Sequence, residues 1–194
     1  MEGKAALFKK FGDVNAVPIC LDTQDKEELI QTVKNIAPCF GGINLEDIAS
    51  PDCFEIEERL DQMLDIPVFH DDQHGTAIIT CAALLNSIKL TGRKTRMGKL
   101  KIVINGAGAA GISIAKLILQ MKFGNVILCN SKGAIYKGAP GNNTEQEKIA
   151  QITNLQNERG CLSDVIKAAD IFIGVSKADE LAAEDVQKMA SDPI

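Results

Sequence analysis

The chain has 194 residues, of which 45% are hydrophobic and 24% are charged, and its net charge is −5. This composition is typical of a folded protein with a substantial core, and the acidic balance argues against a nucleic-acid-binding protein, whose surface would be basic. No apolar run is long enough to span a membrane, and the N-terminus lacks the basic and apolar segments of a secretory signal.

Helical and strand patterns alternate over the first 72 residues. Helices are predicted over 4–11, 25–36 and 51–64, and short strands over 17–21, 42–45 and 66–69. Carboxylates follow each predicted strand, namely Asp22, then Glu46 and Asp47, then Asp71 and Asp72. Ligands of open α/β sheets bind beyond the carboxyl ends of the strands, so the positions of these side chains predict a Mg²⁺ or Mn²⁺ site.

Two alternatives to this metal site stay open on spacing alone. Asp47 and Asp72 could instead cap the helices that follow them, as aspartate often does. His70 and His74 are four residues apart, a spacing that suits zinc on a helix. Residues 71–73 between them are predicted to form a loop, so an ordinary structural role is favoured for both histidines.

The most specific motif follows an apolar helix predicted over 75–90 and a basic connector over 91–100. A β-branched strand over 101–105 leads into a G-x-G-x-x-G turn, and a helix is predicted over 112–122. In this setting Gly106 permits the tight turn, Gly108 lets the backbone approach a pyrophosphate, and Gly111 lets the helix pack on the strand. The helix N-terminus offers N–H groups to the phosphates. The residues expected to bind NAD or NADP here are Asn105, Gly106, Ala107, Gly108, Ala109, Ala110 and Gly111.

The remaining pattern completes a dinucleotide-binding unit. It predicts strands over 126–130 and 171–175, a loop over 131–143, and helices over 145–152, 162–169 and 183–189. This alternation indicates an α/β fold, with a Rossmann-type parallel sheet over 73–194 preceded by part of a smaller α/β domain over 1–72. Residues 193–194 look like the start of another strand. We therefore expect a piece of a longer protein.

The choice between NAD and NADP depends on the turn after the second strand of this unit. The acidic residue expected about 20 positions beyond the glycines falls at Asn130. Asparagine can bond a ribose 2′-hydroxyl without repelling a 2′-phosphate, and Lys132 and Lys137 are close enough in sequence to attract one. Asn130, Ser131 and Lys132 are expected to line the adenosine end. The alternative is that both lysines are simply solvated.

Several of these segments together resemble the malic enzyme family, in its bacterial short form. The segments are 41–48, 68–77 and 105–111, extended by 1–8, 131–136 and 170–176. They follow the family's order over essentially the whole chain. The resemblance implies metal-dependent oxidative decarboxylation of L-malate to pyruvate and CO₂, with reduction of NAD or NADP.

The resemblance also implies roles for individual residues. Lys4 would accept the proton of the substrate's C2 hydroxyl, which requires a lowered pKa, and Asp71 would orient it. Glu46, Asp47 and Asp72 would hold Mg²⁺ or Mn²⁺. Val175 and Ser176 would lie near the nicotinamide.

Two parts of the family pattern fall outside the chain. The family's proton-donating tyrosine lies upstream of Lys4, and Tyr136 belongs to a different motif; a substrate-binding asparagine would follow Ile194. We therefore expect the central part of a malic enzyme, with little full turnover alone. Alternatives are a malolactic relative that releases lactate, or a non-catalytic module that binds dinucleotide and metal.

Further expectations concern the protein's setting. Six cysteines without a C-x-x-C pair, mostly inside apolar runs, favour reduced thiols and a cytoplasmic location. The family resemblance implies a homodimer. Its expected partners are the small molecules malate and pyruvate, with no nucleic acid and no membrane.

Overall fold

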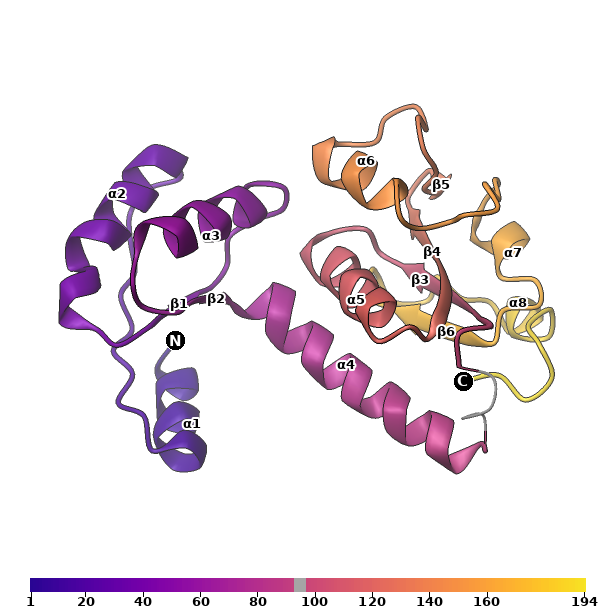
Figure 1. Ribbon diagram of the computed structural model, residues 1–194, viewed down its shortest axis with the longest axis horizontal. Helices are drawn as coiled ribbons and strands as arrows, with labels where there is room; N and C mark the ends of the chain where they lie inside the picture. The colour runs from indigo at the N-terminus through magenta and orange to yellow at the C-terminus, as the bar shows by residue number, and fades with distance from the viewer. Residues whose placement is uncertain (93–96) are drawn as a thin grey trace.

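The computed structural model describes residues 1–92 and 97–194, in two α/β parts joined through a long helix (Figure 1). The predicted connector over 91–100 falls partly on 93–96, which lie outside the described residues. The first part contains α1 (Glu2–Gly12), α2 (Lys26–Ile36), the 3₁₀ helix η1 (Ala37–Cys39), β1 (Ile43–Leu45), α3 (Asp52–Met63) and β2 (Val68–His70). The second part follows α4 (Asp71–Leu90) and contains β3 (Leu100–Asn105), α5 (Ala109–Gln120), β4 (Gly124–Asn130), β5 (Gly133–Ala134), α6 (Thr144–Ala150), α7 (Leu162–Val165), β6 (Ile171–Gly174) and α8 (Ala183–Val186).

The first part is built on two parallel strands. β1 pairs with β2 in a register that sets Leu45 opposite His70. The residues that follow, Glu46 and Asp71, therefore leave the sheet side by side. Apolar residues of α2, α3 and β1 form a small core beneath the strands. The pairing of β1 and β2 thus brings the ends of two distant segments together.

The strand predicted over 17–21 is wrong. The structure assigns no strand to these residues, and Val17 and Ile19 are 64% and 42% exposed. Pro18 lacks a backbone N–H and cannot complete a ladder. With no strand at 17–21, Asp22 does not follow a strand end as predicted.

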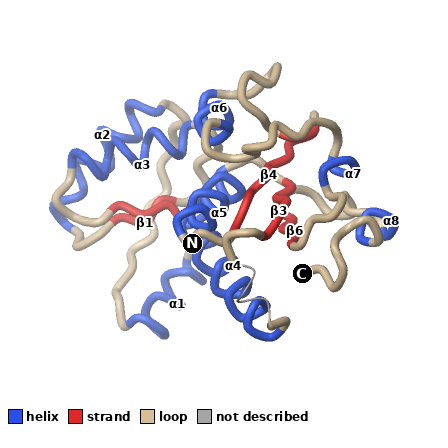
Figure 2. The backbone as a smooth tube through the Cα atoms, turned by 45° about the vertical axis from the view of Figure 1, so that its right-hand side comes forward, coloured by secondary structure: helices blue, strands red, loops and turns tan. Residues whose placement is uncertain are grey.

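The second part is the predicted Rossmann-type sheet, with strand order β5-β4-β3-β6. β3 lies parallel to both β4 and β6. Side chains alternate across it, because Ile102 and Ile104 belong to the core with α5 while Val103 belongs to the core with α7. Helices thus cover both faces (Figure 2), which confirms the predicted fold class. Unlike the prediction, residues 131–143 include β5, which pairs antiparallel with β4.

The long helix α4 ties the two parts together. Its residues Ala77 and Leu84 share one core with Phe54 of α3 and with Ala107 of the glycine-rich turn. The ammonium of Lys116 on α5 also lies 5.2 Å from the Phe54 ring centre. The start of α4 and the glycine-rich turn are therefore anchored in the same core. Within the described residues, no helix is both long and apolar enough to cross a membrane.

Candidate functional site

The glycine-rich turn lies at the carboxyl end of β3, where the chain enters α5. Gly106 has a φ of 122°, and a Cβ there would lie 2.6 Å from the carbonyl oxygen of Val175. Gly111 lies inside α5, which begins at Ala109 rather than at the predicted residue 112. A Cβ at Gly111 would overlap the carbonyl oxygen of Gly106. Close backbone contacts therefore require glycine at both positions.

Gly108 has a different environment. It is the N-cap of α5 without a side-chain cap, and a Cβ there would meet no atom within 4 Å. Open space therefore lies directly before the helix N-terminus, beside the N–H groups of Ala109 and Ala110. β4 and β6 lie on opposite sides of β3, so the direction of the strand order reverses at β3. The turn that follows β3 therefore lies at the topological switch point of the sheet. The residues present fit a pyrophosphate, because the missing side chain leaves room and the helix end supplies donors.

A surface cleft opens beside this turn. It has a volume of about 440 Å³, and its lining includes Asn105, Gly174 and Ser176. The backbone N–H of Val175 donates to the Asn105 carbonyl at 2.9 Å. The Asn105 side-chain amide donates to Glu180 at 2.5 Å. No sequence motif marks Glu180, and 75 positions separate it from Asn105, so sequence patterns do not predict this contact.

The predicted adenosine-end residues occupy one hairpin. Asn130 pairs with Gly133 across β4 and β5, which places Ser131 and Lys132 at the tip. The Asn130 side-chain oxygen accepts the Lys132 backbone N–H at 2.8 Å and closes the turn. This hairpin lies at the carboxyl end of β4, on the same edge of the sheet as the glycine-rich turn.

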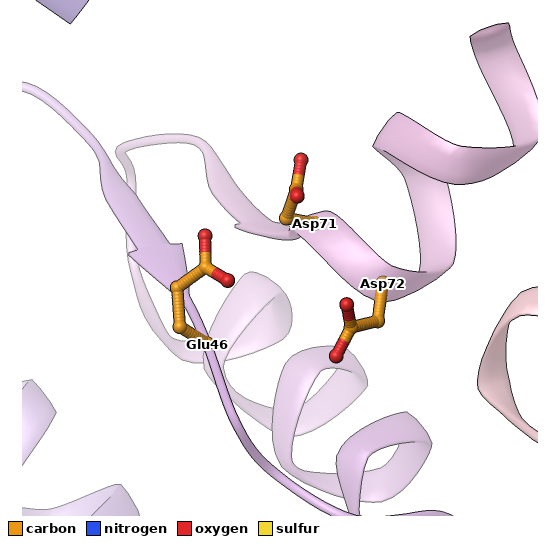
Figure 3. A group of neighbouring side chains, drawn as sticks. All are labelled: Glu46, Asp71 and Asp72. Carbon is orange, nitrogen blue, oxygen red and sulfur yellow. The ribbon is translucent and has the colours of Figure 1, made fainter. Parts of the chain in front are cut away.

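A cluster of three carboxylates lies at the carboxyl ends of β1 and β2 (Figure 3). Glu46, Asp71 and Asp72 each offer an oxygen, and these oxygens lie within 4.8 Å of one another. The structure brings these three together and does not include Asp47 in the group. Asp47 follows Glu46 with a φ of 56°. Its predicted role as a ligand stays a prediction.

Lys4 of α1 reaches this carboxylate cluster. Its ammonium forms an ion pair with Glu46 and donates to Asp71 at 2.9 Å. Partial burial is the largest single effect on the Lys4 pKa and lowers it. The hydrogen bonds and charges of Glu46 and Asp71 together outweigh burial, so the Lys4 pKa is raised. This direction is opposite to the one that a base requires.

The first turn of α4 differs from the prediction. Residues 71–73, predicted to form a loop, belong to the helix, and Asp71 and Asp72 lie in its first turn. The helix N-cap is His70, and no side-chain cap is present. α3 begins after Pro51, also without a side-chain cap. The capping alternative for Asp47 and Asp72 is therefore wrong.

The chemistry of the cluster fits a divalent cation. Three carboxylates so close repel one another, and Lys4 supplies one positive charge against them. The negative charge that remains is close to what one hard divalent cation would balance. Carboxylate oxygens are the preferred ligands of such a cation. Among the described residues, this is the group of metal-binding side chains that the structure assembles.

The fold and these two regions define a dinucleotide-binding α/β protein with a carboxylate cluster suited to a divalent cation. Comparison with known families narrows this class. Residues 73–193 match the model "Malic enzyme, NAD binding domain", and residues 23–61 match "Malic enzyme, N-terminal domain". The chain belongs to the malic enzyme family, which confirms the resemblance seen in the sequence.

Individual relatives support this assignment. The chain is 55% identical to the bifunctional malic/malolactic enzyme of Bacillus subtilis, covering all of the chain and 47% of that protein. It is 48% identical to the NADP-dependent malic enzyme of Rhizobium meliloti, covering all of the chain and 25% of that protein. The crystal structure of the NAD-dependent malic enzyme of Thermotoga maritima superposes with a TM-score of 0.95 at 46% identity, covering all of the chain and 51% of that structure. The chain thus spans a quarter to about half of these relatives.

Proposed function

We propose that this chain carries the cofactor- and metal-binding core for oxidative decarboxylation of L-malate to pyruvate and CO₂, with NAD or NADP as the oxidant. The observation that carries this proposal is the meeting of Lys4, Glu46, Asp71 and Asp72 at one point. Both this point and the glycine-rich turn are anchored in the core that α4 shares with α5.

The proposed roles follow from the contacts of each side chain. Lys4 is the group that accepts the C2 hydroxyl proton at its Nζ, and Asp71, 2.9 Å away, orients it. Because Glu46 and Asp71 hold the proton on Lys4 in this structure, a base role requires that Glu46 bind another cation instead. Glu46, Asp72 and Asp47 are the proposed ligands of Mg²⁺ or Mn²⁺. When bound, the cation supplies Lewis-acid chemistry that draws electrons toward the substrate oxygen.

The cofactor end divides into three proposed contacts. The turn from Asn105 to Gly111 binds the pyrophosphate, and bound NAD or NADP supplies the hydride acceptor. Val175 and Ser176, at the end of β6, face the nicotinamide half beside the cleft. Asn130, Ser131 and Lys132 contact the adenosine ribose.

We expect Asn130→Asp to weaken NADPH binding about tenfold while NADH affinity changes by less than about threefold. The aspartate keeps the acceptor that closes the hairpin and can bond a 2′-hydroxyl, but it repels a 2′-phosphate. Isothermal titration with both reduced cofactors measures this. Asn125→Asp, at the opposite end of β4, is the matched control and should change neither affinity. If Asn130→Asp weakens NADPH and NADH binding equally, the hairpin does not discriminate between the two cofactors.

The activity is tested with L-malate and Mn²⁺, offering NAD⁺ and NADP⁺ separately and measuring pyruvate. Because the chain spans only part of its relatives, the assay compares this chain with a chimera. In the chimera the Bacillus subtilis enzyme supplies all residues outside the matched segment. We expect the chimera to form pyruvate with one reduced cofactor per turnover. A chimera that binds NADPH or NADH and Mn²⁺ yet forms no product would support the non-catalytic alternative.

A malolactic activity is the second candidate, because the Bacillus subtilis relative is named as bifunctional. The same assay separates the two reactions. Lactate without net cofactor reduction would indicate the malolactic reaction, since the hydride then returns to the product.

A further inference from the structure

The first turn of α4 is attached to α3 through Glu57. One Glu57 oxygen accepts the His70 backbone N–H at 2.9 Å and lies 2.8 Å from His74 Nε2. The Glu57 side chain is only 12% exposed, and the His74 ring lies against Phe69 with centroids 5.4 Å apart. Because His70 is the uncapped N-cap of α4, Glu57 supplies from another helix the acceptor that the N-cap backbone lacks locally.

A second contact supports the same attachment. The buried Gln73 side chain donates to the Cys53 carbonyl at 3.2 Å. Cys53 and Glu57 lie one helical turn apart on α3, so a single face of this helix holds α4. Burial raises the pKa of the Cys53 thiol to about 11, and the charges of Glu57 and Asp72 add to this effect.

The carboxylate cluster needs such an attachment for a physical reason. Glu46, Asp71 and Asp72 repel one another, and this repulsion favours a first turn of α4 that moves away from β1. Asp71 also lies over Gly75, where a Cβ would overlap its carboxylate. The position of these oxygens therefore depends on how firmly the backbone of residues 70–75 is held.

We infer that Glu57 and His74 are positioning residues, which fix the first turn of α4 and so hold Asp72 in the geometry that binds a divalent cation and Asp71 beside Lys4. This inference rests on the metal-dependent function proposed above. Neither residue belongs to the carboxylate cluster itself. Groups that orient metal ligands commonly change metal affinity by 10–100-fold when they are removed.

The test measures Mn²⁺ affinity by electron paramagnetic resonance of the free ion, on the full chain. Glu57→Ala should weaken Mn²⁺ binding at least about tenfold. Glu57→Gln keeps an oxygen acceptor for the His70 backbone N–H and should stay within about threefold of the unsubstituted chain. Glu58→Ala is the matched control, because it removes the same charge from the next residue of α3, which is exposed. His74→Ala leaves the contact between Glu57 and the His70 N–H in place and should weaken Mn²⁺ binding less than Glu57→Ala does, and the double variant should be no worse than Glu57→Ala.

Hydrogen exchange in EDTA gives a readout without metal. The amides of residues 70–74 should exchange faster in Glu57→Ala but not in Glu57→Gln, and this comparison also reports whether the variants are folded. Equal Mn²⁺ affinities for Glu57→Ala and Glu58→Ala would overturn the positioning role while leaving the metal site intact. No Mn²⁺ binding by the unsubstituted chain would overturn the metal site, and this inference with it.

Discussion

Gly111→Ala is expected to lower both the stability of the protein and its affinity for NADH. The added methyl group would overlap the carbonyl oxygen of Gly106, a backbone atom that the β3–α5 packing holds in place. Such overpacking costs about 3 kcal/mol, whereas alanine regains about 1 kcal/mol of helix propensity. The net loss of about 2 kcal/mol corresponds to a fall in Tm of about 4–8 °C. Differential scanning calorimetry and NADH titration measure the two effects.

Gly108→Ser is the control that separates binding from folding. Serine at the N-cap suits the extended backbone of Gly108, and open space surrounds its Cβ, so Tm should stay the same or rise. Its hydroxyl would occupy the space and the N–H donors that a pyrophosphate uses, so NADH affinity should fall about tenfold or more. If Gly108→Ser binds NADH normally, the pyrophosphate does not lie at this turn.

Local patterns predicted those parts of the fold in which sequence neighbours act together. The β-branched strand and glycine spacing from residue 101 to 111 identified β3 and the start of α5. Predicting that Glu46 and Asp71 meet needed only the rule that neighbouring strands end at one edge, and the β1–β2 register agrees. The pattern failed at Val17, where apolar residues resemble a strand but the structure assigns no strand to the described residues 17–21.

The start of α4 shows why part of the candidate site could not be predicted. Gly75 reads as a helix boundary, because glycine is a poor helix former. In the fold Gly75 lies inside α4. The Asp71 carboxylate takes the space that a side chain at this position would fill, so the fold requires glycine there. Glu57 and Glu180 gave no sequence signal at all. Each acts through a contact between distant segments, and such contacts depend on the packing of complete helices and loops.

Asp72→Ala and Lys4→Met are expected to change Mn²⁺ affinity in opposite directions. Asp72 supplies one of three clustered carboxylates, and losing it should weaken Mn²⁺ binding about 100-fold or more. Lys4 instead competes with the cation, because its ammonium occupies Glu46 and Asp71. Removing that charge should tighten binding about tenfold, the equivalent of about 1.4 kcal/mol. In the chimera, Lys4→Met should nevertheless abolish pyruvate formation, because the proposed proton acceptor is gone.

Opposite responses of the two variants distinguish a cation site from a structural ion-pair cluster. If the cluster only stabilises the fold, Lys4→Met leaves the carboxylates uncompensated and lowers Tm, and Mn²⁺ restores nothing. If the cluster binds a cation, Mn²⁺ replaces the lost charge and raises the Tm of Lys4→Met more than that of the unsubstituted chain. Asp61→Ala, an exposed acid of α3 outside the cluster, controls for net charge and should change neither Tm nor Mn²⁺ affinity. A Lys4→Met chain that binds Mn²⁺ less tightly than the unsubstituted chain would show that Lys4 supports the cation site rather than competing for it.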